Sequence, residues 1–208
     1  MITTVTLIVV GCSAVYGLIT SMKPKTPLFY RIVVYGFGSY FFGITYSLLY
    51  QKIVSGQASF HAGYLGYAGT FFFLFSSYFG ALDRLADGRE KEYRIYRVAA
   101  LVPVVCIFVA GIYRYLEGGG LIKQLLLLPV AGTAYFSCKH LLLPDVEMGI
   151  IRSMRLYNAI ILIWCLIQPF AIELLLGNSH NTVIGVMNTL IIAAALPLAR
   201  AGVKKWFI

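Results

Sequence analysis

The sequence predicts an all-α integral membrane protein, a seven-transmembrane-helix bundle with its N-terminus outside and its C-terminus cytoplasmic. Three observations lead to this class. The mean hydropathy is +0.82 and only 12% of the residues are charged, about half the share that soluble domains carry. The apolar residues form runs of about 20, the length that crosses a bilayer. The basic residues gather in alternate connections between these runs.

Seven apolar runs are long enough to span, and each one is closed by charged or turn-forming residues. The closing stretches are "KPKTP", "SGQAS", the charged residues 83–97, "EGGG", "LPDVEMG" and "GNSHN". The runs use about 140 positions, which leaves no room for a soluble domain, so residues 1–208 are predicted to form a single membrane domain. In chain order, the predicted spans are 2–21, 28–50, 60–82, 98–116, 121–143, 156–177 and 182–201.

The charge asymmetry sets the predicted orientation. The connections between the runs form two alternating sets, and one set holds only three basic residues, Lys52, Arg114 and Lys123. Because basic residues favour the cytoplasmic side, this bias predicts a cytoplasmic C-terminus and explains the net charge of +9 without nucleic acid. The short loops favour a bacterial inner membrane. The opposite set of connections, together with the C-terminal tail, holds fourteen basic residues: Lys23, Lys25, Arg31, Arg84, Arg89, Lys91, Arg94, Arg97, Lys139, Arg152, Arg155, Arg200, Lys204 and Lys205.

The connection between the third and fourth spans is the most highly charged part of the chain. Residues 81–98 hold nine of the 25 charged residues, and two acid–base pairs in it are spaced four apart, the favourable order on a helix. One interpretation is a solvated loop that anchors the topology. The other is a docking surface for a cytoplasmic protein partner, formed by Asp87, Arg89, Glu90, Lys91 and Arg94.

Polar residues inside the spans are the candidates for a ligand site, because burying them in a membrane is costly. Four predicted helices place such residues at similar depth in the outer half. We therefore expect a small-molecule cavity between the second, third, sixth and seventh spans. The alternative is an interfacial aromatic belt with ordinary packing. The candidate ligand-binding residues are Glu173, Gln168, Asn188, Tyr46, Tyr64, Tyr67 and Thr70.

Prolines fall in each of the last four spans, at Pro103, Pro129, Pro169 and Pro197. Proline removes a backbone donor and bends or breaks a helix. The stretch "WCLIQPF" at 164–170 combines an aromatic residue, a glutamine and a proline. It is the best hinge candidate, with Trp164 and Pro169 as its hinge residues.

Glycines in the second and third spans predict close helix packing. Gly36 and Gly43 are seven residues apart and share one helix face, while Gly63, Gly66 and Gly69 lie in "HAGYLGYAGTF". Homodimerisation is the minor interpretation of the same residues.

No motif in the sequence requires a cofactor or a metal ion. The four cysteines form no C-x-x-C pair, and Lys204 and Lys205 lie past the end of the seventh span, where a retinal Schiff base could not form. His61, His180 and Glu173 could make a two-histidine, one-carboxylate site, but nothing in their spacing enforces it. No catalytic motif is found, so an enzyme is the less favoured class.

The resulting expectation is a receptor-like or sensory protein. It would bind a small ligand in the outer-half cavity and act through a cytoplasmic partner, with the lipid bilayer as its surroundings. A small-solute transporter is the main alternative. An intramembrane lipid enzyme and a structural subunit follow.

Overall fold

The computed structural model describes residues 2–53, 60–83, 91–118, 120–144, 149–175 and 182–207, and over these residues every regular element is helical. The third helix, α3, passes directly into a π-helical turn, η1. The elements in chain order are α1 (Ile2–Ser21), α2 (Leu28–Ile53), α3 (Gly63–Ser77), η1 (Tyr78–Leu82), η2 (Lys91–Tyr93), α5 (Arg94–Ala99), α6 (Val102–Leu116), α7 (Leu121–Leu125), α8 (Leu127–Leu142), α9 (Ile150–Leu175), α10 (Thr182–Lys204) and η3 (Lys205–Phe207).

Within the described residues, seven helical stretches are long and apolar enough to cross a membrane, as predicted. Several ends were predicted wrongly. The fourth stretch begins at Lys91 rather than at residue 98, and α9 begins at Ile150 rather than at residue 156. Helices continue past the apolar runs because charged residues are good helix formers, and hydropathy marks only the apolar part of each helix.

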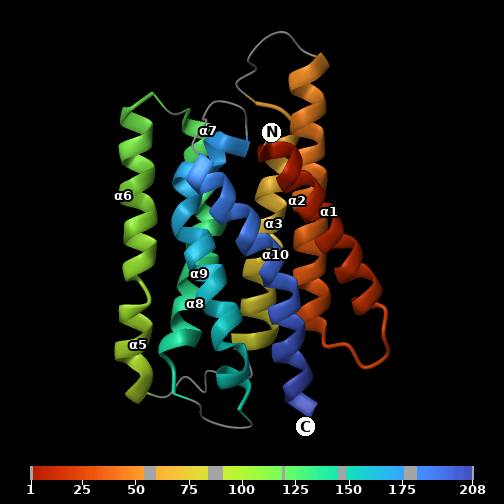
Figure 1. Ribbon diagram of the computed structural model, residues 1–208. Coiled ribbons are helices and arrows are strands. Elements are labelled where there is room, and N and C mark those ends of the chain that lie inside the picture. Colours follow the sequence, from red (N-terminus) through yellow and green to blue (C-terminus); the bar gives the residue numbers. More distant parts are fainter. Residues whose placement is uncertain are drawn as a thin grey trace.

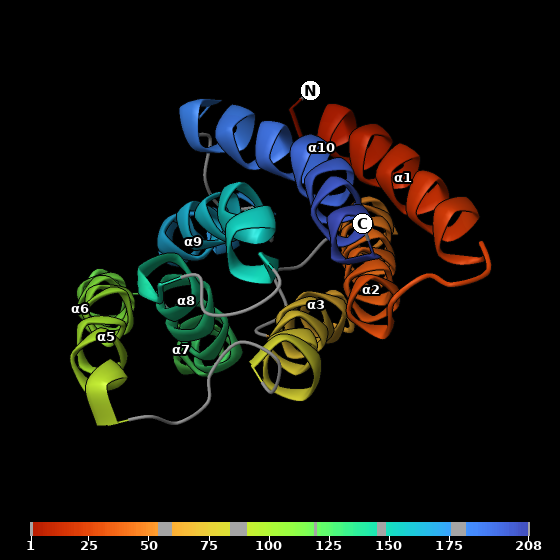
Figure 2. The same ribbon diagram turned by 90° about the horizontal axis from the view of Figure 1, so that it is seen from below.

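The helices pack as a closed bundle. In Figure 2, neighbours follow the order α1, α2, α3, α8, α9 and α10, and the contacts between successive helices agree with that order. Helices α5 and α6 stand outside this ring, where α6 packs on α8 and α9, and the short α7 leads into α8. The two ends of the chain lie at opposite ends of the bundle (Figure 1). We call the end at Ile2 the N side and the end at Lys204 the C side.

Large aromatic side chains fill the centre of the bundle. Trp164 of α9 is fully buried and packs against rings from two neighbouring helices, with ring centres 5.6 Å from Phe37 and 5.0 Å from Phe71. Many apolar side chains on the outside are more than half exposed, among them Phe42 and Val105. An aromatic core with an apolar exterior suits a helical bundle surrounded by lipid.

Glycine brings α2 and α3 into backbone contact, which confirms the packing predicted from the glycines. A Cβ atom placed on Gly66 would clash with Gly43, whose backbone nitrogen would lie 2.6 Å away. Ser39 of α2 donates a 3.0 Å hydrogen bond to the carbonyl oxygen of Gly66. No side chain fits between the helices here, so their separation is set by the backbones themselves.

Two prolines break predicted single helices. Proline cannot donate to the carbonyl four residues earlier and clashes with it. The residue four positions before Pro103 is Ala99, where α5 ends. The residue four positions before Pro129 is Leu125, where α7 ends. The predicted spans 98–116 and 121–143 are therefore each two helices in sequence, whereas α9 and α10 continue through Pro169 and Pro197.

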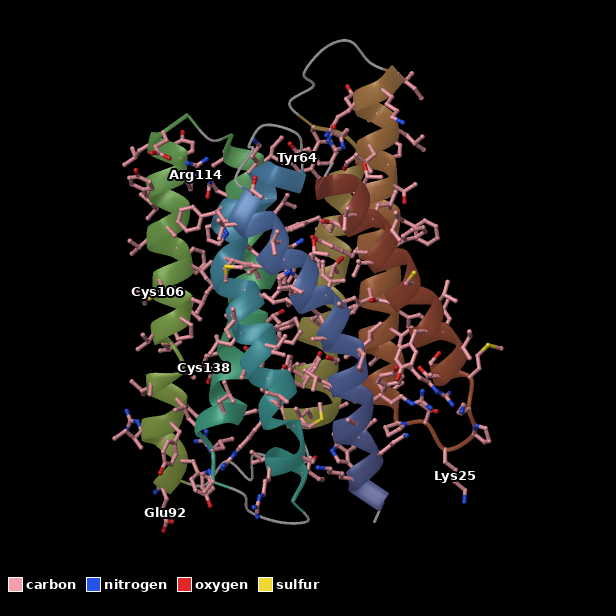
Figure 3. The ribbon with its side chains drawn as sticks, viewed as in Figure 1. Lys25, Tyr64, Glu92, Cys106, Arg114 and Cys138 are labelled. Atoms are coloured by element: carbon pink, nitrogen blue, oxygen red, sulfur yellow. The ribbon has the colours of Figure 1, made fainter. Side chains whose placement is uncertain are left out.

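Charge separates along the bundle axis. Helix direction places Lys52, Arg114 and Lys123 on the N side, and Figure 3 shows Arg114 there and Lys25 and Glu92 at the opposite end. The described basic residues of the C side are Lys23, Lys25, Arg31, Lys91, Arg94, Arg97, Lys139, Arg152, Arg155, Arg200, Lys204 and Lys205.

Candidate functional site

A chain of hydrogen bonds joins four helices in the N-side half of the bundle. Tyr67 of α3 donates to Oε1 of Gln168 over 3.0 Å, and Nε2 of Gln168 donates to the carbonyl oxygen of Trp164 over 3.1 Å. The indole nitrogen of Trp164 donates to Oδ1 of Asn188 over 2.7 Å, and Nδ2 of Asn188 donates to the hydroxyl of Tyr40 over 3.1 Å. We call these five residues the N-side polar chain.

All five side chains of the N-side polar chain are buried, and Trp164, Gln168 and Asn188 have no exposed surface. Trp164 and Gln168 lie four residues apart, so they stand about one turn from each other on one face of α9, where Trp164 meets α10 and Gln168 meets α3. Buried polar groups are retained only when they are paired. Here a single chain of donors and acceptors pairs them across α2, α3, α9 and α10.

Three of the seven predicted ligand-binding residues, Gln168, Asn188 and Tyr67, thus meet in one network. Thr70 is also buried, but its hydroxyl donates to the Gly66 carbonyl of its own helix over 2.8 Å. Glu173 belongs to α9, and its side chain lies outside the described residues. Of the two predicted hinge residues, Trp164 belongs to this network, and Pro169 directly follows Gln168 in the sequence.

The two remaining candidates, Tyr46 and Tyr64, surround His61 instead. The imidazole ring of His61 lies 4.9 Å from the ring of Tyr50, 4.7 Å from Tyr64 and 6.1 Å from Tyr46. Its Nδ1 accepts a 3.2 Å hydrogen bond from the backbone N–H of Gly63. Burial lowers the pKa of His61, which precedes α3. This aromatic group is separate from the N-side polar chain.

Tyr46 also lines a hollow of about 350 Å³ on the outer surface between α2 and α3. The other lining residues are almost entirely apolar and include Phe42 and Leu49. Such a lining suits a lipid chain better than a polar ligand.

A second polar group lies on the C side. Asp83 follows η1 and forms an ion pair with Lys139 of α8, and its Oδ1 lies 3.5 Å from Nε2 of His140. Tyr78 of η1 donates a 2.9 Å hydrogen bond to Oδ1 of Asn158 on α9, and its ring stacks on His140 at 5.8 Å. We call these five residues the C-side polar cluster.

The C-side polar cluster was not predicted. Lys139 was expected in a cytoplasmic connection, but only 3% of Lys139 and none of the neighbouring His140 is exposed. In a sequence, basic residues near a helix end look like interfacial anchors, so the burial of Lys139 and His140 could not be predicted. Asn158 offered a signal, because an asparagine inside an apolar run is costly to bury. Among the described residues, its Nδ2 has no hydrogen-bond partner.

Two helices connect the N-side polar chain with the C-side polar cluster. α9 carries Gln168 and Asn158, and α3 with its continuation η1 carries Tyr67 and Tyr78. At 1.5 Å per residue, each pair is separated by about 15 Å along its helix. The π-helical turn lies at the C-side end of this connection, and such turns often occur at functional sites.

The predicted docking surface is only partly described. Asp87, Arg89 and Glu90 lie outside the described residues, and so does His180. Lys91 belongs to η2 and Arg94 begins α5, and both are exposed at the C side.

Comparisons of the chain with protein-family models, with curated proteins and with solved structures find no significant match.

Proposed function

We propose that this protein is a membrane sensor of the receptor-like class, with the N side outside and the C side in the cytoplasm of a bacterial inner membrane. A small ligand entering from the N side would rearrange the N-side polar chain. The C-side polar cluster and the charged segment around Lys91 and Arg94 would pass this change to a cytoplasmic partner. The 14-to-3 distribution of basic residues supports the orientation.

One observation carries the proposal: α3 and α9 each contribute to both polar groups. A ligand that alters the hydrogen bonds of Gln168 or Tyr67 displaces a helix that also holds Asn158 or Tyr78. A packed bundle transmits such a displacement because its interior resists compression. Signalling of this kind requires a ligand that binds the two arrangements with different affinity.

Trp164 gives a direct readout, because the chain has only two tryptophans and the other is Trp206. In a Trp206→Phe background, purified protein would be screened against amines, metabolites and lipids by Trp164 fluorescence and by melting temperature. A ligand present at a hundred times its Kd should stabilise the protein by about 2.7 kcal/mol. We expect a compound that changes both signals.

A substitution in the C-side polar cluster then tests the coupling. Asn158→Leu should change the Trp164 response to that compound, although residue 158 lies six positions from Trp164. Thr189→Val is the matched control: Thr189 is next to Asn188 on α10 but faces α1, where its hydroxyl contacts Thr6 at 2.7 Å. If the Asn158 variant responds like the control, the two polar groups are not coupled and the sensor proposal fails.

A small-solute transporter is the second candidate, and the C-side polar cluster favours it. The C-side halves of the fourth and seventh predicted spans hold few polar side chains, which alone would disfavour a polar transport route. The cluster supplies an ion pair and an amide on α8, α9 and the end of η1. Uptake of the stabilising compound by proteoliposomes, abolished by Asp83→Asn, would identify a transporter rather than a sensor.

A further inference from the structure

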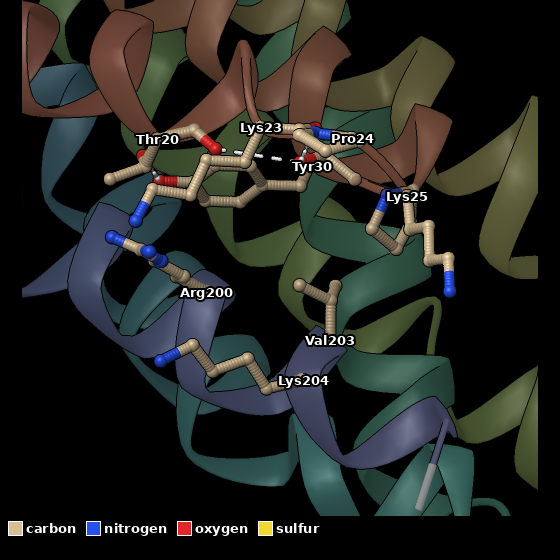
Figure 4. A pocket seen from close by; sticks show the side chains of 10 residues that line it. Thr20, Lys23, Pro24, Lys25, Tyr30, Arg200, Val203 and Lys204 are labelled. Carbon is tan, nitrogen blue, oxygen red and sulfur yellow. Dashed lines mark hydrogen bonds between the residues drawn. The ribbon is translucent and has the colours of Figure 1, made fainter.

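A basic hollow of about 240 Å³ opens at the C side, between the α1–α2 connection and the end of α10 (Figure 4). Four cationic side chains line it: Lys23, Lys25, Arg200 and Lys204. No carboxylate occurs among its lining residues within the described part of the chain. The volume of the hollow is several times the ~30 Å³ that one water molecule occupies in the liquid, so the hollow can admit a small anion.

The α1–α2 connection presents its lysines from a tight turn. The backbone N–H of Thr26 donates to the carbonyl oxygen of Lys23 over 3.3 Å, and the Thr26 hydroxyl donates to the same oxygen over 2.7 Å. Pro24 occupies the second position of this turn, and Lys25 the third, with a φ of 64°. Glycine or asparagine ordinarily takes that third position. A lysine is therefore held where the backbone disfavours any ordinary side chain.

The other walls of the hollow are equally well defined. Nη1 of Arg200 donates to the hydroxyl of Tyr16 over 3.3 Å, and its guanidinium lies 5.6 Å from the centre of that ring. The hydroxyls of Tyr30 and Thr20 are buried and 2.7 Å apart. Tyr30 lies in the first turn of α2, whose N-terminal end carries a partial positive charge.

We propose that this hollow binds a phosphate group. In Figure 4, the charged ends of Lys23, Arg200 and Lys204 lie on the same side of the hollow. Cations gathered in this way repel one another unless an anion lies between them. Phosphate fits because its several oxygens can accept from a guanidinium and from two ammonium groups together. The phosphate has two possible sources, an anionic phospholipid headgroup at the membrane surface or a free phosphate ion.

The test uses the full-length protein with the double variant Lys23→Gln/Lys204→Gln. Both side chains are exposed, so folding should be retained. The matched control is Lys91→Gln/Lys205→Gln, which removes the same charge from exposed C-side residues that do not line the hollow. One arm measures inorganic phosphate binding in detergent by calorimetry, against chloride at equal ionic strength. The other measures retention of phosphatidylglycerol by native mass spectrometry, from nanodiscs that contain phosphatidylglycerol and phosphatidylcholine.

Binding in either arm should be at least tenfold weaker in Lys23→Gln/Lys204→Gln than in the control, because two charge-assisted hydrogen bonds are lost. Loss in the phosphatidylglycerol arm alone identifies a lipid site, and loss in the inorganic phosphate arm identifies a site for a soluble ion. Equal binding by the two double variants in both arms, or no binding by the wild-type protein in either, would overturn the proposal.

Discussion

The indole nitrogen of Trp164 lies 2.7 Å from Oδ1 of Asn188, and this hydrogen bond ties helix α9 to α10. It is the shortest of the four bonds in the N-side polar chain. Asn188 also donates to Tyr40, so a single amide holds three helices together.

Replacing Asn188 with leucine should destabilise the protein by about 1–3 kcal/mol, because the buried Trp164 N–H loses its acceptor. Thr189→Val removes a hydroxyl at the adjacent position, and hydrogen bonds between membrane helices average about 0.6 kcal/mol. Unfolding in mixed detergent micelles would measure both changes. Equal losses in the two variants would mean that the amide contributes no more than an ordinary helix contact.

Gly66→Ala should destabilise the α2–α3 pair by about 1–3 kcal/mol, the usual cost of overpacking. The new methyl group would meet the backbone of Gly43. Gly38→Ala is the control, because a Cβ at Gly38 has no neighbour within 4 Å. There alanine should stabilise α2 by up to about 1 kcal/mol through its higher helix propensity. The thermal midpoints of the two variants should therefore move in opposite directions.

Removing the Asp83 carboxylate should cost about 3–5 kcal/mol, because the buried Lys139 ammonium loses its ion pair with Asp83. Asp83→Asn combined with Lys139→Met should recover most of that loss, since the double variant removes both charges of this pair. A double-mutant cycle of unfolding free energies measures the interaction. Strictly additive effects would show that the ion pair does not stabilise the fold.

The stability of the protein should fall as the pH drops below about 6.5, with His61 contributing to the fall. Burial lowers the pKa of His61 in the folded protein from its ordinary value of 6.5. The folded chain then binds fewer protons than the unfolded chain between these two pKa values, so acid favours unfolding there. Asn in place of His61 can still accept from the Gly63 N–H but does not titrate.

Melting temperatures of the wild-type protein and of His61→Asn, recorded from pH 8 to pH 5, check this contribution. The difference between the two proteins should be constant above about pH 7 and should shift in favour of His61→Asn at lower pH. A difference that stays constant across the range would exclude His61 as a contributor.

Pro169→Ala should make α9 stiffer, because alanine supplies the N–H that the carbonyl of Cys165 lacks in the wild-type helix. Hydrogen exchange of the backbone amides around residues 165–172 should slow in this variant, while Pro197→Ala should slow exchange only in α10. Unchanged exchange in α9 would show that Pro169 is not a hinge.

The sequence was sufficient to predict seven apolar helical stretches and the α2–α3 glycine contact, because both follow from local composition and spacing. It also indicated that Gln168, Asn188 and Tyr67 come from similar levels of their helices, and the three residues do belong to one hydrogen-bonded network. It could not give their partners, since Tyr40 meets Asn188 only when helices 148 residues apart in sequence pack together. It also could not show that Asp83, which follows an apolar run and looks like a loop residue in the sequence, contacts the buried Lys139 and His140 in the folded bundle.

The glycine contact between α2 and α3 limits how the bundle can move. Two helices that touch backbone to backbone, with Ser39 bonded across the seam, can neither slide nor roll past one another without a clash. They therefore behave as one rigid unit. Under the proposed sensing mechanism, a displacement carried by α3 must move α2 with it, whereas a displacement carried by α9 changes the distance between α9 and α2. Distance probes placed on α9 and referenced to α2 would therefore distinguish the two routes from the N-side polar chain to the C-side polar cluster.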